Sequence, residues 1–200
     1  MKIFNRVFKE RILYEDDNTS IRKSVENALK RKVNLSVADL SGADLSGANL
    51  AGANLARANM TGADLTRADL TGANMTGAGL AGADLSHTNL THTNLSGANL
   101  SRADLTVADL SRADLTWADL TGANLCGSTG NNIEIKTIQT GIYIVNIVEK
   151  FEYIQIGCEM HTIERWFNFT NREILEKDGK KALKWCKKWK PILVAILEYK

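Results

Sequence analysis

Residues 38–60 read ADLSGADLSGANLAGANLARANM, and the same five-residue pattern runs without insertion or deletion from residue 33 to residue 127. Each unit has the form A-D/N-L-S/T/A-x, with Leu or Met at its centre from Leu35 to Leu125, which makes nineteen units in 95 residues. A period of five fits neither the 3.6-residue helical turn nor the two-residue alternation of a strand. The sequence therefore predicts short extended sides joined by turns, wound into a solenoid.

The unbroken five-residue pattern resembles the pentapeptide-repeat family. The resemblance implies a mainly β fold, a right-handed quadrilateral β-helix with four units in each coil, over about half of the chain. The segment ahead of the repeats, a predicted hairpin and helix, is also similar to the lead-in of many phage and prophage members of that family. The resemblance thus implies a phage or bacterial setting for the protein.

With four units per coil, residues twenty apart stack in columns, and the inward Leu and Ala side chains fill a narrow core. A solenoid this thin leaves no interior pocket, so we expect function on the outer faces, the ends or the flanking segments. One outward column is an acidic stripe, which is either a solvated face of turn-capping carboxylates or a charged contact surface. The stripe consists of Asp44, Asp64, Asp84 and Asp104.

The flanks divide the chain into three predicted domains, 1–32, 33–127 and 128–200. The first holds a β-hairpin that turns at Lys9 and Glu10, and a helix capped by Thr19 or Ser20 that covers the first coil. The last is a compact α+β domain with three strands at 133–138, 142–148 and 151–156 and a turn or loop at 157–161. Its helices begin after Thr162, at a Thr170–Glu173 capping box and at Lys180, with a break or kink at Pro191.

The charges are unevenly distributed, although the whole chain carries 25 basic and 23 acidic residues. The repeats carry four Arg and nine Asp, a net of −5, whereas both flanking segments are mildly basic. Three widely separated cysteines, Cys126, Cys158 and Cys186, predict unpaired thiols in a reducing cytoplasm, which is the host cytoplasm if a phage encodes the protein. We identify no signal peptide or membrane span, and expect no membrane partner and no cofactor.

The C-terminal segment carries the candidate chemistry. Cys158 and His161 lie three residues apart, a pairing that suits a thiolate nucleophile, although a sheet-edge Cys and a surface His are the structural alternative. Two nearby ligands fall short of a zinc site, so no metal is expected. Trp185 and Trp189 lie among lysines that include Lys188, which suits a nucleotide or, less well, a nucleic acid; the alternative is a helix with Trp in the core and Lys in water. The predicted binding set is Cys158, His161, Trp166, Trp185, Lys188 and Trp189.

Three classes of function follow. The first is a non-enzymatic interaction protein, in which a rigid solenoid presents a C-terminal recognition domain to a protein partner, for instance as a phage-encoded modulator of a host or defence protein. The second, implied by the resemblance, is a DNA mimic that acts on gyrase or another DNA-binding protein. The third is a C-terminal domain that sequesters a small nucleotide or depends on a thiol. We also expect a homodimer through the Trp- and Leu-rich C-terminal region.

Overall fold

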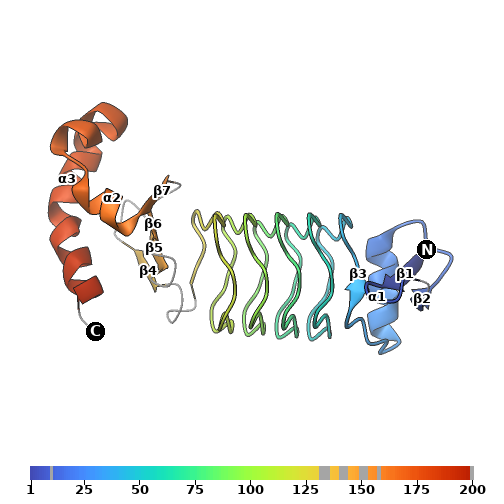
Figure 1. The fold of residues 1–200 in the computed structure, drawn as a ribbon. Helices are drawn as coiled ribbons and strands as arrows, with labels where there is room; N and C mark the ends of the chain where they lie inside the picture. Colours follow the sequence, from blue (N-terminus) through green and yellow to red (C-terminus); the bar gives the residue numbers. More distant parts are fainter. Residues whose placement is uncertain (10, 131–135, 140–143, 149–152, 157–158, 199–200) are drawn as a thin grey trace.

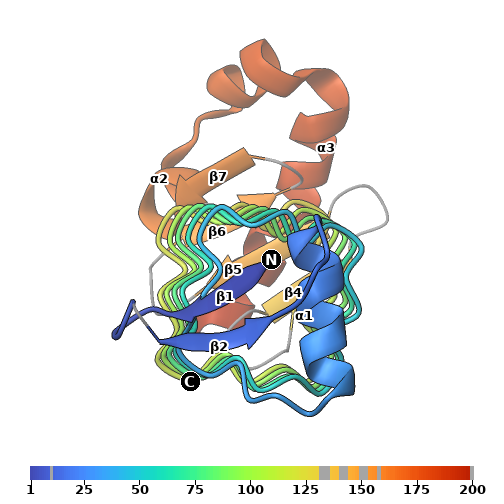
Figure 2. The ribbon, with the colours of Figure 1, turned by 90° about the vertical axis from the view of Figure 1, so that its right-hand side faces the viewer.

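The solenoid lies between an N-terminal cap and a C-terminal α/β segment (Figure 1). The computed structural model describes residues 1–9, 11–130, 136–139, 144–148, 153–156 and 159–198. Figure 2, which looks along the solenoid, shows successive coils stacked as nearly superimposed squares. The N-terminal cap and the C-terminal segment lie at opposite ends of this stack (Figure 1).

Parallel bridges between residues twenty apart confirm four units per coil. One ladder joins Asp44 to Asp64, and continues through Asp84 and Asp104 to Asn124. Along it, the Leu45 amide donates to the Asp64 carbonyl at 2.8 Å, and the Asp64 amide donates to the Ala43 carbonyl at 3.0 Å. Bridges extend from Asp39 to Thr129, so each side of the square is a short parallel β-ladder.

The corners are β-turns with left-handed backbone at their third residue. In one example the Ala48 amide donates to the Leu45 carbonyl at 2.9 Å, and Gly47 has a φ of 63°. This is the geometry of a type II turn, which favours glycine at that position. The outward carboxylate before the turn closes it further, because Asp44 Oδ1 accepts from the Ser46 amide at 3.1 Å and from Ser46 Oγ at 2.7 Å. The turn-capping interpretation of the Asp side chains of the stripe is confirmed, and Asn74 at the same position of another unit accepts from the Thr76 amide in the same way.

The interior of the solenoid is filled with side chains. Central residues such as Leu65, Met75 and Leu85 are fully buried. Two units carry Thr in place of the inward Ala, and both hydroxyls find a backbone acceptor: Thr93 Oγ1 donates to the Leu70 carbonyl at 2.7 Å, and Thr88 Oγ1 donates to the Leu85 carbonyl. Burying a hydroxyl costs free energy unless it is hydrogen-bonded, so these contacts make the substitutions tolerable.

A hairpin and a helix close the N-terminal end, as the sequence predicted. Strands β1 (Lys2–Asn5) and β2 (Ile12–Glu15) pair antiparallel, and β1 also pairs with β3 (Ala38–Asp39) in the first coil. Helix α1 (Ile21–Lys30) begins after Ser20, whose side chain makes no capping hydrogen bond. Ile3 and Val25 share one hydrophobic core with the solenoid. The helix is therefore a lid on the first coil.

The C-terminal segment is an antiparallel sheet covered by helices. The strands β4 (Lys136–Gln139), β5 (Ile144–Val148), β6 (Tyr153–Ile156) and β7 (Glu159–Thr162) pair in sequence order. The helices are α2 (Ile163–Asn168) and α3 (Asn171–Glu198).

Two details of this segment differ from the sequence prediction. The expected loop at 157–161 contributes a fourth strand from Glu159, because β7 continues the sheet through an Ile154–His161 pair. The expected helices at Thr170 and Lys180 form one helix that continues through Pro191. The proline removes one backbone donor, but Trp185 and Leu193 on either side of it pack into the same core.

One cysteine contradicts the expectation of unpaired thiols. Cys126 is disulfide-bonded, whereas Cys186 is a buried thiol and Cys158 falls outside the described residues. Cys126 occupies the outward fourth position of its unit, where the side chain is half-buried rather than enclosed in the core. The cysteine argument for a reducing compartment therefore no longer holds.

Candidate binding surface of the C-terminal domain

A second hydrophobic core, separate from that of the solenoid, organises the C-terminal domain. Ile154 on β6, Trp166 on α2 and Leu193 on α3 are buried in it. Trp185 meets Trp166 edge to face at 6.4 Å between ring centroids and stacks against Trp189 at 6.4 Å. Because Trp166 and Trp185 are only 5% and 4% exposed, their rings hold α2 and α3 together rather than present a contact surface.

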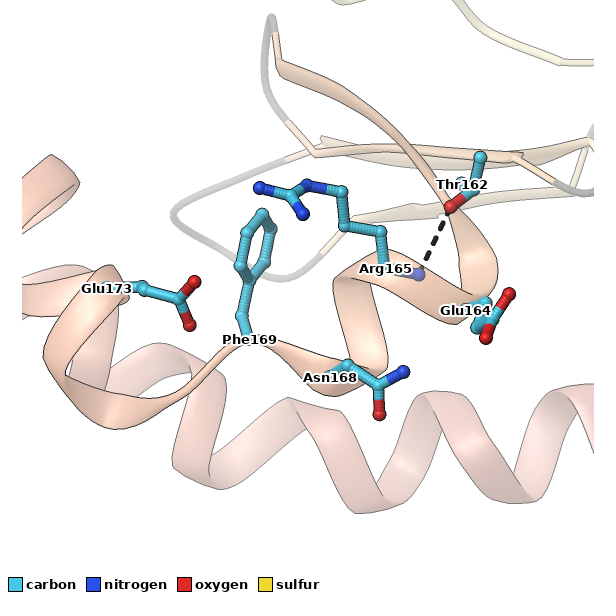
Figure 3. A pocket seen from close by; sticks show the side chains of 6 residues that line it. All are labelled: Thr162, Glu164, Arg165, Asn168, Phe169 and Glu173. Atoms are coloured by element: carbon cyan, nitrogen blue, oxygen red, sulfur yellow. Dashed lines mark hydrogen bonds between the residues drawn. The ribbon is translucent and has the colours of Figure 1, made fainter.

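A shallow hollow of about 250 Å³ opens beside this core, where β7 passes into α2 and the chain turns into α3 (Figure 3). The Arg165 guanidinium lies 5.3 Å from the centroid of the Phe169 ring. The His161 ring meets the same phenyl group edge to face at 4.8 Å. The hollow is lined by Thr162, Glu164, Arg165, Asn168, Phe169 and Glu173.

Helix caps fix the backbone on both sides of the hollow. Thr162 Oγ1 accepts from the Arg165 amide at 3.1 Å, which starts α2. At the start of α3, Glu173 Oε2 accepts from the Thr170 amide at 2.8 Å and from Thr170 Oγ1 at 2.7 Å, the capping box expected from the sequence. These hydrogen bonds lower the pKa of Glu173, and the nearby Arg165 lowers it further.

The lining combines opposite charges above an aromatic ring. Arg165 contributes a guanidinium, Glu164 and Glu173 contribute carboxylates, and Asn168 adds an amide. A guanidinium over a phenyl ring is well placed to donate to a carboxylate. The two carboxylates disfavour a polyphosphate at the same place, so the arrangement suits a polar protein segment better than a nucleotide.

The predicted binding residues are distributed over two places. His161 lies beside the hollow through Phe169. On α3, exposed Lys188 places its Nζ 5.7 Å from the ring centroid of half-buried Trp189. Trp166 and Trp185, two further members of the predicted set, are buried in the core of the domain. Cys158 lies outside the described residues, so the pairing of a thiol with His161 stays a prediction.

Sequence reasoning did not predict that four residues would line a common hollow, namely Arg165, Asn168, Phe169 and Glu173. A usable signal was present, since Thr162 and the capping box at Thr170 bracket one very short helix. Such spacing predicts that the end of the first helix and the start of the next lie close together.

Within the described residues, no group of three or more His, Cys, Asp or Glu side chains could hold a metal ion. Nor does any described helix have the length and apolar character needed to cross a bilayer.

The acidic stripe lies on the solenoid as predicted, with four carboxylates on one face. Asp44, Asp64, Asp84 and Asp104 follow one another along a single bridge ladder. Each accepts a hydrogen bond from the amide two residues later, and those from Ser46 lower the pKa of Asp44. The stripe is thus first a row of turn caps, and a role in binding stays a prediction.

Comparison with known proteins agrees with this fold. The model of the family described as "Pentapeptide repeats" matches the chain in eight copies, over residues 38–77, 68–106, 78–116 and 108–132. The chain therefore belongs to the pentapeptide-repeat family through its solenoid, a family whose members form right-handed quadrilateral β-helices. No curated protein matches the chain.

Several solved structures are similar to the repeats. Rfr23 from the cyanobacterium Cyanothece 51142 is 35% identical, with 46% of this chain and 61% of that chain covered and a TM-score of 0.43. The protein alr5209 from Nostoc PCC 7120 is 33% identical over 56% of this chain and 80% of that chain, with a TM-score of 0.21. QnrB1, a plasmid-mediated fluoroquinolone resistance protein, is 25% identical over 45% and 59% of the two chains, with a TM-score of 0.24. The chain thus spans about three fifths of the length of Rfr23.

Proposed function

We propose that the protein is a non-enzymatic interaction protein, in which the solenoid is a rigid scaffold and the C-terminal domain recognises a protein partner. One observation carries the proposal: the solenoid core is filled by buried Leu, Met and Ala, while the hollow at Arg165 and Phe169 lies on the C-terminal domain. Pentapeptide-repeat proteins are in general structural or interaction scaffolds, which supports the same conclusion.

The partner segment that best fits the hollow carries an acidic group and a polar surface. Its carboxylate pairs with the Arg165 guanidinium, which lies over the Phe169 ring, and its donors face Glu164 and Asn168. Truncating a well-placed contact at the centre of an interface typically costs about 2 kcal/mol or more, which is about a thirtyfold loss of affinity.

Affinity purification from the native cell tests the proposal, with the variant Arg165→Glu beside the wild type. We expect the wild-type chain to retain a reproducible partner that Arg165→Glu loses. Arg172→Glu is the matched control, because Arg172 is exposed on α3 and pairs with Glu176 at 2.8 Å, outside the hollow. Equal retention by all three chains would place the contact elsewhere.

The variants Cys158→Ala and His161→Ala distinguish a thiol-dependent enzyme from a non-enzymatic interaction protein. A binding protein keeps most of its effect in both variants, whereas a thiol-dependent enzyme loses it while the fold and partner affinity stay intact. His161 in the described structure packs on Phe169, which favours a supporting role for its ring. Loss of the effect with intact partner binding would favour the enzyme.

The DNA-mimic alternative, directed at gyrase, has less support. Fewer than five coils at roughly 4.8 Å each give a rod of about 20–25 Å, and duplex DNA of that length carries about 14 charges. The repeats carry a net charge of −5, between basic flanks. The stripe of Asp44 to Asp104 therefore imitates only a small part of a duplex, unless two copies join end to end.

The proposal includes an assembly and a setting. A homodimer through the C-terminal region is expected to give twice the monomer mass in light scattering, and a chain ending at residue 130 is expected to lose it. A monomer at high concentration would remove the dimer from the proposal.

The N-terminal lead-in favours a phage-encoded modulator of a host or defence protein, acting in the host cytoplasm. Lys188 and Trp189 are the residues to test if a nucleotide is the ligand instead.

A further inference from the structure

The N-terminal hairpin exposes apolar side chains on the face that does not contact the solenoid. Five of the eight exposed large hydrophobic residues of the described chain lie within residues 1–12. Phe4 and Ile12 are cross-strand partners on the outer face, at 38% and 40% exposed, whereas Ile3 on the inner face is 1% exposed. The loop between the strands carries the largest exposures of the hairpin, Val7 at 63% and Phe8 at 66%.

Hydrogen bonds hold this loop in place. The buried Asn5 side chain accepts from the Val7 amide at 2.8 Å and from the Phe8 amide at 2.9 Å, and the Arg11 amide donates to the Phe8 carbonyl at 2.8 Å. Figure 2 shows the loop between β1 and β2 projecting beyond the square outline of the solenoid. The apolar tip can therefore reach a flat surface without a clash from the coils.

Basic residues surround the tip. Arg6, Lys9 and Arg11 flank Val7 and Phe8, and residues 1–12 contain four basic side chains and one acidic side chain. Arg6 donates to the Arg57 carbonyl at 2.7 Å, which ties the base of the loop to the solenoid. A partner that complements this surface must combine apolar material with a layer of negative charge.

We propose that the hairpin tip binds an anionic lipid bilayer, with Val7 and Phe8 in the interfacial zone and the flanking cations at the phosphates. Anionic membrane surfaces attract clusters of Lys and Arg, and apolar side chains beside them enter the boundary between headgroups and acyl chains. This proposal departs from the sequence expectation of no membrane partner, which rested on the lack of a spanning segment and did not consider an exposed apolar tip among cations.

A second copy of the chain fits this surface less well. A second hairpin carries the same positive charge, so two tips facing each other repel. The acidic stripe of a second solenoid offers opposite charge, but the corners beside it carry Gly47, Arg67 and His87, and of the described residues Val107 is the one large apolar side chain exposed along it. A bilayer supplies both components in one surface.

Vesicle sedimentation with the purified full chain tests the proposal. We expect sedimentation with phosphatidylcholine vesicles that contain phosphatidylglycerol, and much less with phosphatidylcholine alone or at high salt. The double change Val7→Ser with Phe8→Ser is expected to lower the partition coefficient by about tenfold or more, because it removes the apolar tip. Lys9→Glu with Arg11→Glu is expected to lower it by a similar factor.

Matched controls lie on the solenoid corners. Val107→Ser alters another exposed valine, and Arg102→Glu with Arg112→Glu reverses two other surface cations. Both controls are expected to sediment like the wild type, and the circular dichroism of every variant is expected to be unchanged. The proposal is overturned if the wild type does not sediment with anionic vesicles at low salt. It is also overturned if Val7→Ser with Phe8→Ser sediments as well as the wild type.

Discussion

At the scale of single residues, an inward leucine has no alternative environment. Leu85 is fully buried in the middle of the stack, where four ladders of side chains meet. Leu85→Ala is expected to destabilise the protein by about 3 kcal/mol, and Leu85→Asp to abolish folding, because a buried carboxylate finds neither water nor a partner. Thermal unfolding followed by circular dichroism measures both. Wild-type melting of Leu85→Asp would contradict the inward assignment.

The corner glycines make a second prediction about backbone conformation. Gly82 has a φ of 63° and open space around the position of a Cβ atom, so only the backbone opposes a larger side chain. Gly82→Val is expected to cost about 1 kcal/mol, since left-handed backbone is unfavourable for a residue with a Cβ atom. Chemical denaturation measures the difference. Ala81→Val, at the preceding residue, is the control and is expected to change stability less.

Asp16 makes stability depend on pH at the N-terminal cap. Burial raises the pKa of its carboxyl, but hydrogen bonds from Ser24, Asn18 and Asn27 outweigh burial and lower the pKa from 3.8 to about 2. A group with a lowered pKa stabilises the folded state above its unfolded pKa, and this contribution disappears as the pH falls. The melting temperature is expected to drop between about pH 4 and pH 2. Asp16→Asn is expected to be less stable at neutral pH and to drop less over that range; an equal drop would exclude Asp16 as the cause.

Sequence alone predicted the inward Leu and Ala and the turn-capping Asp, because each repeats at one position of a fixed period. The period also places Trp117 at the outward last position of its unit, and its side chain is 79% exposed. Outside the repeats, the sequence left open whether Trp185 faces the core or a ligand, and the structure buries it. Exposure of such residues depends on which elements pack over them, and the pattern of one segment does not contain that information.

At the scale of elements, the capping box sets where α3 begins. Thr170 and Glu173 exchange hydrogen bonds across the first turn, with the Glu173 amide donating to Thr170 Oγ1 at 3.3 Å. Thr170→Ala is expected to destabilise the C-terminal domain by about 1 kcal/mol, whereas Thr170→Ser retains the hydroxyl and most of the stability. Hydrogen exchange of the first turn of α3 measures the effect. Equal protection in Thr170→Ala and the wild type would show that packing alone fixes the helix start.

The repeats and the N-terminal lid were predictable as elements, because periodicity and apolar spacing specify them locally. The fourth strand, β7, was not, since its edge position depends on pairing with β6 rather than on its own composition. The unbroken course of α3 through Pro191 has a similar origin in tertiary packing. The same limit applies to the hollow, whose lining comes from β7, α2 and α3 together.

At the scale of the whole molecule, two separate cores predict unequal effects of truncation. Ile3 and Val25 belong to the solenoid core, whereas Trp166 and Leu193 belong to the C-terminal core. A chain ending at residue 130 is expected to retain the β spectrum and melting transition of the solenoid. A chain starting at residue 33 is expected to aggregate or melt earlier, because the first coil loses its apolar cover. Loss of the solenoid transition in the first truncation would show that the two cores fold as one.

The four-unit coil also limits how the protein can change in length. Bridges join residues twenty apart, so gain or loss of one whole coil leaves every remaining residue on its original face. Gain or loss of a single unit instead turns everything beyond it by one side of the square. The row of carboxylates from Asp44 to Asp104 would then be divided between two faces, and the C-terminal domain would point in a new direction relative to the N-terminal lid. Evolution by repeat duplication is therefore expected to proceed in steps of one coil wherever the relative direction of the two ends matters.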